Sequence, residues 1–191
     1  GRAMGKLLYG MITSLDGYAV AAEGDLGRGA EDDEVHSYIG DLFRDVGTYL
    51  YGRRMYETMV FWETAHLEPE VPEHILDYSR IWRGADKVVF SSTLERVASG
   101  RTRIERTFDP DQIRRLKADS EHDLTVDGPT LAAQAIRAGL VDEYHLFTTT
   151  SVVGGGTPFF PDDVRLDLEL VDLRRFGTGL VHTHYRAAEP R

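Results

Sequence analysis

Short apolar runs alternate with longer amphipathic segments along most of this chain, and this alternation restricts the folds open to it. The runs at residues 6–12, 48–51, 87–90 and 124–126 have the length and apolar character of buried strands. The segments between them repeat apolar residues at spacings of three and four, which is typical of helices packed on a sheet. Strands alternating with helices are joined by crossovers, so their pairing is expected to be parallel. The sequence therefore predicts an α/β fold with a mostly parallel central sheet flanked by helices.

The helix ends carry recognisable signals. Glu31, Asp32 and Asp33 suit the N-terminus of a helix because the helix dipole favours negative charge there. Asp109 is a suitable N-cap, with Pro110 at the first helical position. Periodicity and caps predict helices at residues 31–45, 72–83, 109–117 and 131–138. A further helix is expected to begin within the segment 52–59.

The last part of the chain changes to strands, expected at residues 143–150, 166–176 and 180–186. Gly177-Thr178-Gly179 separates the last two and is typical of a hairpin turn. No repeat, linker or low-complexity segment interrupts the sequence. We therefore expect a single domain over residues 4–188 that closes in an antiparallel hairpin.

Composition limits the partners and the compartment. The formal net charge of −10 argues against nucleic acid as a partner, because that role needs a basic surface. The absence of cysteine excludes disulfides and cysteine-ligated zinc, and it agrees with a reducing compartment. No segment approaches the roughly 18 apolar residues of a membrane span, and no signal peptide is evident. We expect a cytoplasmic protein that binds neither membranes nor nucleic acid.

Turns with polar or glycine residues follow the predicted parallel strands, where ligands of such sheets bind. They read SLDG at 14–17, GRRM at 52–55, SSTL at 91–94 and DGPT at 127–130. Each turn alone has an ordinary explanation as a turn or a cap. Arg53 and Arg54 at a helix entrance suit a bound anion, but an isolated pair could equally be solvated. The functional interpretation depends on whether these turns meet at one edge of the sheet.

Other chemistries find little support. The phosphate loop G-x-x-x-x-G-K-[ST], the dinucleotide fingerprint G-x-G-x-x-G after a strand and the hydrolase elbow G-x-S-x-G are all absent. His182 and His184 share one face of the last strand and could bind a metal, but no third ligand is evident. An exposed pair is the preferred interpretation, and His145 is assigned a structural role. We expect no metal site.

Three stretches together resemble the dihydrofolate reductase-like superfamily. They are SLDGY at 14–18, YGRRMYETM at 51–59 and the long C-terminal pattern with VVGGGTPFF at 152–160 and LELVDLRRFGTG at 168–179. More closely, the chain resembles the C-terminal reductase domain of bacterial bifunctional riboflavin deaminase–reductases, the RibD C-terminal domain family, in a stand-alone form. The deaminase half of those proteins needs zinc-ligating cysteines, so this cysteine-free chain resembles the reductase half only.

The resemblance implies NADPH as the cofactor. Gly52 would let the backbone approach it, while Arg53 and Arg54 would meet its 2′-phosphate or pyrophosphate. Ser91 and Ser92 would lie on the adenosine side. The remaining cofactor-binding residues that the resemblance implies are Ile12, Ser14, Asp16 and Gly17 around the ring, Gly128, Pro129, Thr130 and Leu131 at the pyrophosphate, and Val153, Gly154, Gly155 and Gly156 beside the nicotinamide ribose.

The chain departs from this family at several positions. Relatives often have serine–arginine–threonine where this chain has Ser91-Ser92-Thr93, which removes one phosphate contact. The turn before the pyrophosphate helix is glycine-rich in many relatives, whereas Asp127 stands here. Its charge would repel a pyrophosphate unless its side chain points away or caps the helix. Asp33 is the choice for the acid on the substrate side.

These expectations combine into one function. The resemblance implies a homodimeric, NADPH-dependent oxidoreductase, similar to riboflavin-pathway or dihydrofolate reductases, that transfers a hydride to a C=N or C=O bond of a small heterocycle. The heterocycle would be pterin- or pyrimidine-like, and Tyr18, Phe61 and Trp62 are candidates for stacking on it. The alternatives left open are a nucleotide-binding sensor or scaffold without turnover, and a structural domain with an empty cleft. The sequence does not choose between NADPH and NADH.

Overall fold

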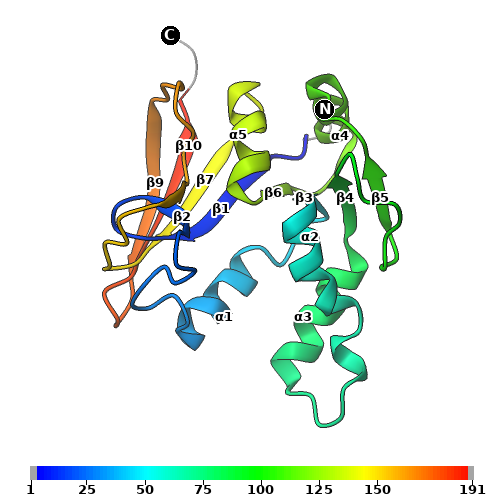
Figure 1. Ribbon diagram of the computed structural model, residues 1–191, viewed down its shortest axis with the longest axis horizontal. Coiled ribbons are helices and arrows are strands. Elements are labelled where there is room, and N and C mark those ends of the chain that lie inside the picture. Colours follow the sequence, from blue (N-terminus) through cyan, green and yellow to red (C-terminus); the bar gives the residue numbers. More distant parts are fainter. Residues whose placement is uncertain (1–3, 189–191) are drawn as a thin grey trace.

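A computed structural model describes residues 4–188 and has an eight-stranded sheet at its centre, in the order β5-β4-β3-β6-β1-β7-β10-β9 (Figure 1). The strands are β1 (Leu7–Thr13), β3 (Thr48–Gly52), β4 (Asp86–Phe90), β5 (Thr102–Glu105), β6 (Leu124–Asp127), β7 (Glu143–Thr148), β9 (Leu168–Arg175) and β10 (Val181–Ala187). The strands from β5 to β7 pair in parallel, while β10 is antiparallel to both β7 and β9. The predicted sheet and its C-terminal hairpin are therefore confirmed.

Helices cover both faces of this sheet. They are α1 (Asp33–Leu42), α2 (Arg53–Met59), α3 (Glu73–Gly84), α4 (Pro110–Asp119) and α5 (Pro129–Arg137), with two 3-10 turns, η1 (Val60–Glu63) and η2 (Ala65–Leu67), after α2. Leu50 and Tyr51 are consecutive in β3 and point to opposite faces. Leu50 belongs to the core with Ile113 of α4 and Ala132 of α5, whereas Tyr51 packs with Trp82 of α3. The helices α1, α2 and α3 thus share the face opposite to α4 and α5.

Several helix boundaries follow from their caps. Asp32 is the N-cap of α1, and its carboxylate accepts a hydrogen bond from the Glu34 N–H at 2.9 Å, so the helix begins at Asp33 and not at residue 31. Asp109 caps α4 as predicted, by accepting from the Asp111 N–H at 3.0 Å. The α5 helix begins at Pro129, two residues before the predicted start, because proline suits the first helical position.

A small two-stranded sheet was not predicted. It pairs β2 (Tyr18–Ala21) with β8 (Gly156–Pro158), two segments to which sequence analysis assigned no strand. Strands this short show little periodicity, and β5 was missed for the same reason. Gly156 has a φ of 140°, and a Cβ atom on it would collide with the Val20 carbonyl oxygen. Glycine is therefore required here for the two strands to approach. No helix within residues 4–188 is long and apolar enough to span a membrane.

Candidate functional site

The predicted turns do meet at one edge of the sheet. The strands β4, β3, β6 and β1 are neighbours in that order and run in parallel, with Gly52 opposite Phe90 and Tyr51 opposite Asp127. The turns at 14–17, 52–55, 91–94 and 127–130 follow the carboxyl ends of these strands. This edge is the usual ligand-binding edge of an open α/β sheet.

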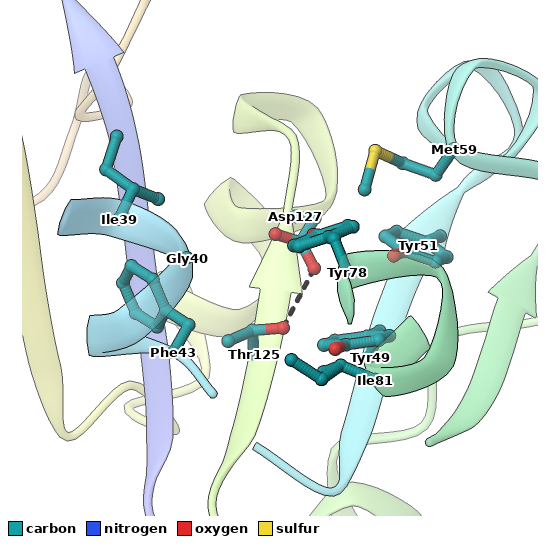
Figure 2. Close-up of a pocket in the computed structure, with 11 residues that line it drawn as sticks. Ile39, Gly40, Phe43, Tyr49, Tyr51, Met59, Tyr78, Ile81, Thr125 and Asp127 are labelled. Atoms are coloured by element: carbon teal, nitrogen blue, oxygen red, sulfur yellow. Dashed lines mark hydrogen bonds between the residues drawn. The ribbon is translucent and has the colours of Figure 1, made fainter. Parts of the chain in front are cut away.

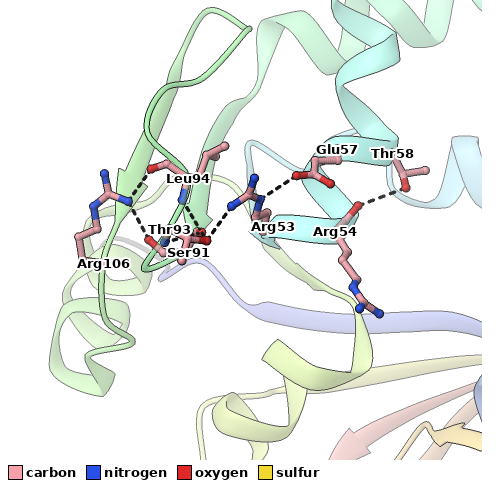
Figure 3. Close-up of polar contacts among 8 residues, drawn as sticks. All are labelled: Arg53, Arg54, Glu57, Thr58, Ser91, Thr93, Leu94 and Arg106. Carbon is pink, nitrogen blue, oxygen red and sulfur yellow. Dashed lines mark hydrogen bonds and ion pairs between the residues drawn. The ribbon is translucent and has the colours of Figure 1, made fainter.

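Arg53 joins two of these turns (Figure 3). Its guanidinium donates to the Thr93 hydroxyl at 2.6 Å and to the Glu57 carboxylate at 2.7 Å, and all three side chains are exposed. The Arg54 guanidinium points the other way in Figure 3, and within residues 4–188 it makes no hydrogen bond or ion pair. Arg54 therefore offers an uncommitted positive charge beside Gly52.

The turn after β4 is held by its own serine and by a distant arginine. The Ser91 hydroxyl accepts from the N–H groups of Thr93 and Leu94, at 3.2 and 3.0 Å. Arg106, which follows β5, donates to the carbonyl oxygens of Ser91 and Leu94. Ser92 is exposed on this turn. Sequence analysis missed Arg106 because it lies outside the turn that it holds. It brings an arginine to the turn in which relatives often carry one.

The loop after β1 is fastened to the loop before β8. The Asp16 carboxylate accepts from the Val153 N–H at 3.1 Å and from the Gly154 N–H at 2.9 Å. The Ser14 hydroxyl and these N–H groups lower the pKa of Asp16 to about 2. Gly17 has a φ of 90°, which fits the tight turn here. Of the other predicted residues, Ile12 lies in β1, Gly155 accepts from the Ala22 N–H, and Gly156 begins β8.

The α5 helix begins beside α2. Gly128 is its N-cap, with a φ of 98°, and the nearest atom to a Cβ built on it is the Met55 Cε of α2, 4.0 Å away. Thr130 is exposed in the first turn, whereas the Leu131 side chain is buried in the core. Leu131 therefore offers only its backbone to a ligand. The first turn of a helix leaves N–H groups without intrahelical partners, which suits an anion.

A cavity of about 120 Å³ opens between α1, α3 and the sheet (Figure 2). It is lined by Gly10, Ile39, Gly40, Phe43, Tyr49, Tyr51, Met59, Tyr78, Ile81, Thr125 and Asp127. Tyr49 lies opposite Thr125, and Tyr51 lies opposite Asp127, across the β3–β6 pair. Figure 2 shows the Asp127 carboxyl among aromatic and aliphatic side chains from both helices.

Asp127 is a candidate functional residue to which sequence analysis assigned no role in the site. Its side chain makes no capping bond to α5, and it points into the cavity, where it accepts from the Thr125 hydroxyl at 2.9 Å. Burial raises the pKa of Asp127 to about 7, and this single hydrogen bond opposes the rise only in part. The signal in the sequence was a polar T-x-D at the end of an otherwise apolar strand. With its carboxyl directed into the cavity, Asp127 would repel a pyrophosphate at the α5 N-terminus less than an outward-pointing carboxylate.

Asp33 does not line this cavity. It is the first residue of α1 and is exposed, while the neighbouring Asp32 caps the helix. Its role as a proton donor stays a prediction.

The aromatic residues of the cavity also differ from those expected. Tyr18 begins β2, Phe61 is exposed, and Trp62 packs on Tyr78 with ring centroids 4.4 Å apart. None of the three lines the cavity.

The histidines of the last strands are not an exposed pair, so that interpretation was wrong. His182 is 1% exposed and His145 is 4% exposed. The His182 ring is hydrogen-bonded to the Tyr38 hydroxyl at 3.0 Å and to His145 Nδ1 at 2.9 Å, while His184 contacts Glu143 at 2.6 Å. Burial lowers the pKa of His182 to about 4 and that of His145 to about 3. No group of three or more histidine, aspartate or glutamate side chains within residues 4–188 is arranged to hold a metal ion.

Solved structures share this fold. A provisionally named riboflavin biosynthesis protein of Shewanella sp. PV-4 has 19% sequence identity and a TM-score of 0.72, with 96% of this chain and 99% of that chain covered. A diaminohydroxyphosphoribosylaminopyrimidine deaminase/5-amino-6-(5-phosphoribosylamino)uracil reductase of Thermotoga maritima has 16% identity and a TM-score of 0.66, with 97% and 57% covered. A pyrimidine reductase-like protein of Corynebacterium diphtheriae has 16% identity and a TM-score of 0.65, with 97% and 93% covered.

Sequence comparisons agree with the structural ones. The Bacillus subtilis (strain 168) protein YyaP, which is described as uncharacterized, is 25% identical over 182 residues, and the match spans 94% of each chain. The model of the RibD C-terminal domain matches residues 6–182. The chain belongs to the RibD C-terminal domain family, as its resemblance predicted.

Proposed function

We propose that this protein is a reductase of the riboflavin-pathway type, which uses NADPH to reduce a C=N or C=O bond of a small pterin- or pyrimidine-like heterocycle. Family membership and the names of the uracil reductase and pyrimidine reductase-like neighbours support this proposal. The observation that carries it is the arrangement of the turns at one edge of the sheet. Arg53 and Arg54 follow β3, and Asp127, which lines the cavity, ends the neighbouring strand β6.

The phosphate end of the cofactor would lie between α2 and α5. Arg54 has an uncommitted guanidinium, and Arg53 contacts the Ser91–Leu94 turn through Thr93. Gly52 and Gly128 carry no side chain that would cover the helix entrances behind them. These donors fit the phosphates of a dinucleotide, because charge-assisted hydrogen bonds from arginine are the strong ones.

The nicotinamide end would lie between the loops that Asp16 joins. The Asp16 carboxylate holds Val153 and Gly154 against the turn after β1. This contact orders both loops at one side of the proposed ring site. When bound, the cofactor supplies the hydride, while the protein supplies position and electrostatics.

One observation favours the alternative of a nucleotide-binding protein without turnover. Asp33, the expected proton donor, is exposed and lies outside the cavity. Turnover of any heterocyclic substrate with NADPH would exclude this alternative.

We extend the proposal to a homodimer. The outer strand β9 exposes Leu170, Val171 and Leu173, and a second copy could cover these side chains. Light scattering in solution would report twice the monomer mass if this holds, and a monomer mass would contradict it.

The first experiment titrates NADPH and NADH into the wild type and into the double variant Arg53→Ala/Arg54→Ala. The wild type should prefer NADPH, and the double variant should lose about ten- to hundredfold in NADPH affinity, because two charge-assisted contacts disappear. NADH affinity should change less, since NADH lacks the 2′-phosphate.

Arg137→Ala is the matched control. Arg137 is exposed at the last turn of α5, at the opposite end from Gly128, so its loss should leave NADPH affinity unchanged. The reductase proposal fails if neither cofactor binds at millimolar concentration.

A further inference from the structure

The cavity beside the proposed cofactor site contains one ionisable carboxyl group. Among its lining residues, all within the described part of the chain, Asp127 is the sole carboxylic acid, and no lysine, arginine or histidine is present. The neighbouring groups are the Tyr49 and Tyr51 side chains of β3, Tyr78 of α3, and apolar residues of α1 and α2. Nothing in the lining therefore neutralises a negative charge on Asp127.

We propose that Asp127 contacts the substrate ring and is the catalytic residue that protonates it during reduction. This inference rests on the proposed reductase function and takes the proton-donor role from Asp33. The cavity, at about 120 Å³, is smaller than the roughly 150 Å³ that holds a benzene ring, so only the reacting edge of a heterocycle would enter it, and that edge would meet the Asp127 carboxyl in the lining. Asp127 also directly precedes Gly128, the N-cap of α5, so the cavity adjoins the proposed pyrophosphate site.

The other proton-bearing groups of the cavity are poorly suited to this role. Burial raises the pKa of the Tyr49, Tyr51 and Tyr78 hydroxyls above the usual range, so they keep their protons at neutral pH. Asp127 has a pKa of about 7 and can give up and regain a proton there. A general acid works best when its pKa is near the working pH. The Thr125 hydroxyl at 2.9 Å from Oδ2 holds the carboxyl in position.

When bound, NADPH would supply a hydride to the carbon of the C=N or C=O bond and would become NADP⁺, and the π electron pair would move to the nitrogen or oxygen. That atom would form a new N–H or O–H bond with the proton of the Asp127 carboxyl, whose own O–H bond would break. Asp127 would be left as a carboxylate and would regain a proton from solvent.

The test measures NADPH oxidation with 7,8-dihydropterin, a ring C=N probe, for the wild type and Asp127→Asn between pH 5.5 and 8.5. The amide keeps the shape but carries no transferable acid proton. We expect kcat to fall about a hundredfold or more in the variant, while KM changes little. Wild-type kcat should decline above a pH of about 7, whereas the residual rate of the variant should be flat across this range.

Asp162→Asn is the matched carboxyl-to-amide control, because Asp162 lies exposed in the loop after β8. Wild-type kcat and pH profile in Asp127→Asn would overturn the proposal. Loss of kcat in Asp33→Asn with a normal Asp127→Asn would also overturn it.

If the wild type binds NADPH but does not reduce the probe, the ring contact is measured directly. The ring probe 5,6-diaminouracil should bind to the NADPH-loaded wild type and at least about tenfold more weakly to Asp127→Leu, which loses the polar contact. Equal binding, or no binding to the wild type, overturns the proposal. Failure of NADPH itself to bind contradicts the proposed reductase function. The ring contact is then measured with 5,6-diaminouracil on the cofactor-free wild type and Asp127→Leu, so the two failures are distinguishable.

Discussion

Two aspartates at the same edge of the sheet have opposite environments. Asp16 follows β1 and Asp127 ends β6, and these strands are neighbours. Asp16 is exposed and accepts two backbone N–H groups, and its pKa falls to about 2. Asp127 sits in a cavity with one hydroxyl partner, and burial raises its pKa to about 7. Hydrogen-bond donors and access to solvent therefore set the charge state of each aspartate, and not the residue type or its position at the edge of the sheet.

The difference in pKa suits Asp16 and Asp127 to different roles. A carboxylate with a pKa of about 2 is charged at every physiological pH, so Asp16 can hold two loops together permanently. A carboxyl with a pKa of about 7 exists in both forms near neutrality, so Asp127 can carry a proton.

Removing the charge from the cavity should have the largest effect on the contrast between Asp127 and Asp16. Between the unfolded pKa of 3.8 and the folded value of about 7, the folded state keeps the Asp127 proton that the unfolded chain has lost. Stability from this group is therefore complete below about pH 4 and is lost as the pH rises to about 7. Asp127→Asn should be more stable than the wild type by about 1–3 kcal/mol at pH 8, with almost no difference near pH 4.

Thermal unfolding at both pH values measures this. Each kcal/mol corresponds to about 2–4 °C in Tm for a chain of this size. A gain in Tm that is the same at pH 4 and pH 8 would mean that the charge of Asp127 is not the cause.

The histidines extend the comparison to bases, with a smaller effect. Burial lowers the pKa of His182 to about 4, so the folded state excludes a proton that the unfolded histidine takes up below about pH 6.5. The stability from its neutral form is complete above about pH 6.5 and falls as the pH drops toward 4. His182→Phe should cost about 1–2 kcal/mol at pH 7.5, because Tyr38 and His145 lose a partner.

The same variant should lose less stability than the wild type between pH 7.5 and pH 5, because one neutral buried histidine is gone. Urea unfolding at the two pH values reports both effects. Parallel losses in the two proteins would show that His182 does not titrate with unfolding.

The smallest effect is expected at Asp16. Asp16→Asn keeps an oxygen acceptor but loses the charge, so the contacts to Val153 and Gly154 weaken without disappearing. We expect NADPH to bind about three- to tenfold more weakly, with little change in stability at pH 7. Fluorescence titration measures the affinity, and Asp162→Asn again serves as the control. Unchanged affinity would separate this loop contact from the cofactor site.

Much of the site was predictable because it is local in the sequence. The Asp109 cap, the Gly177–Gly179 turn and the polar turns after each strand follow from residue type and short-range spacing. Once the strands are parallel neighbours, those turns must share one edge.

The residue pattern alone was enough to predict the alternation of strand and helix, the parallel sheet and the edge that carries the polar turns. Three features depend on tertiary packing: Asp127 enters a cavity, His182 is buried against Tyr38, and Arg106 reaches the Ser91 turn. A spacing of two shows which strand residues share a face, but not which helix covers that face or how completely. Burial and charge depend on segments far apart in the chain, so they arise only when those segments pack together.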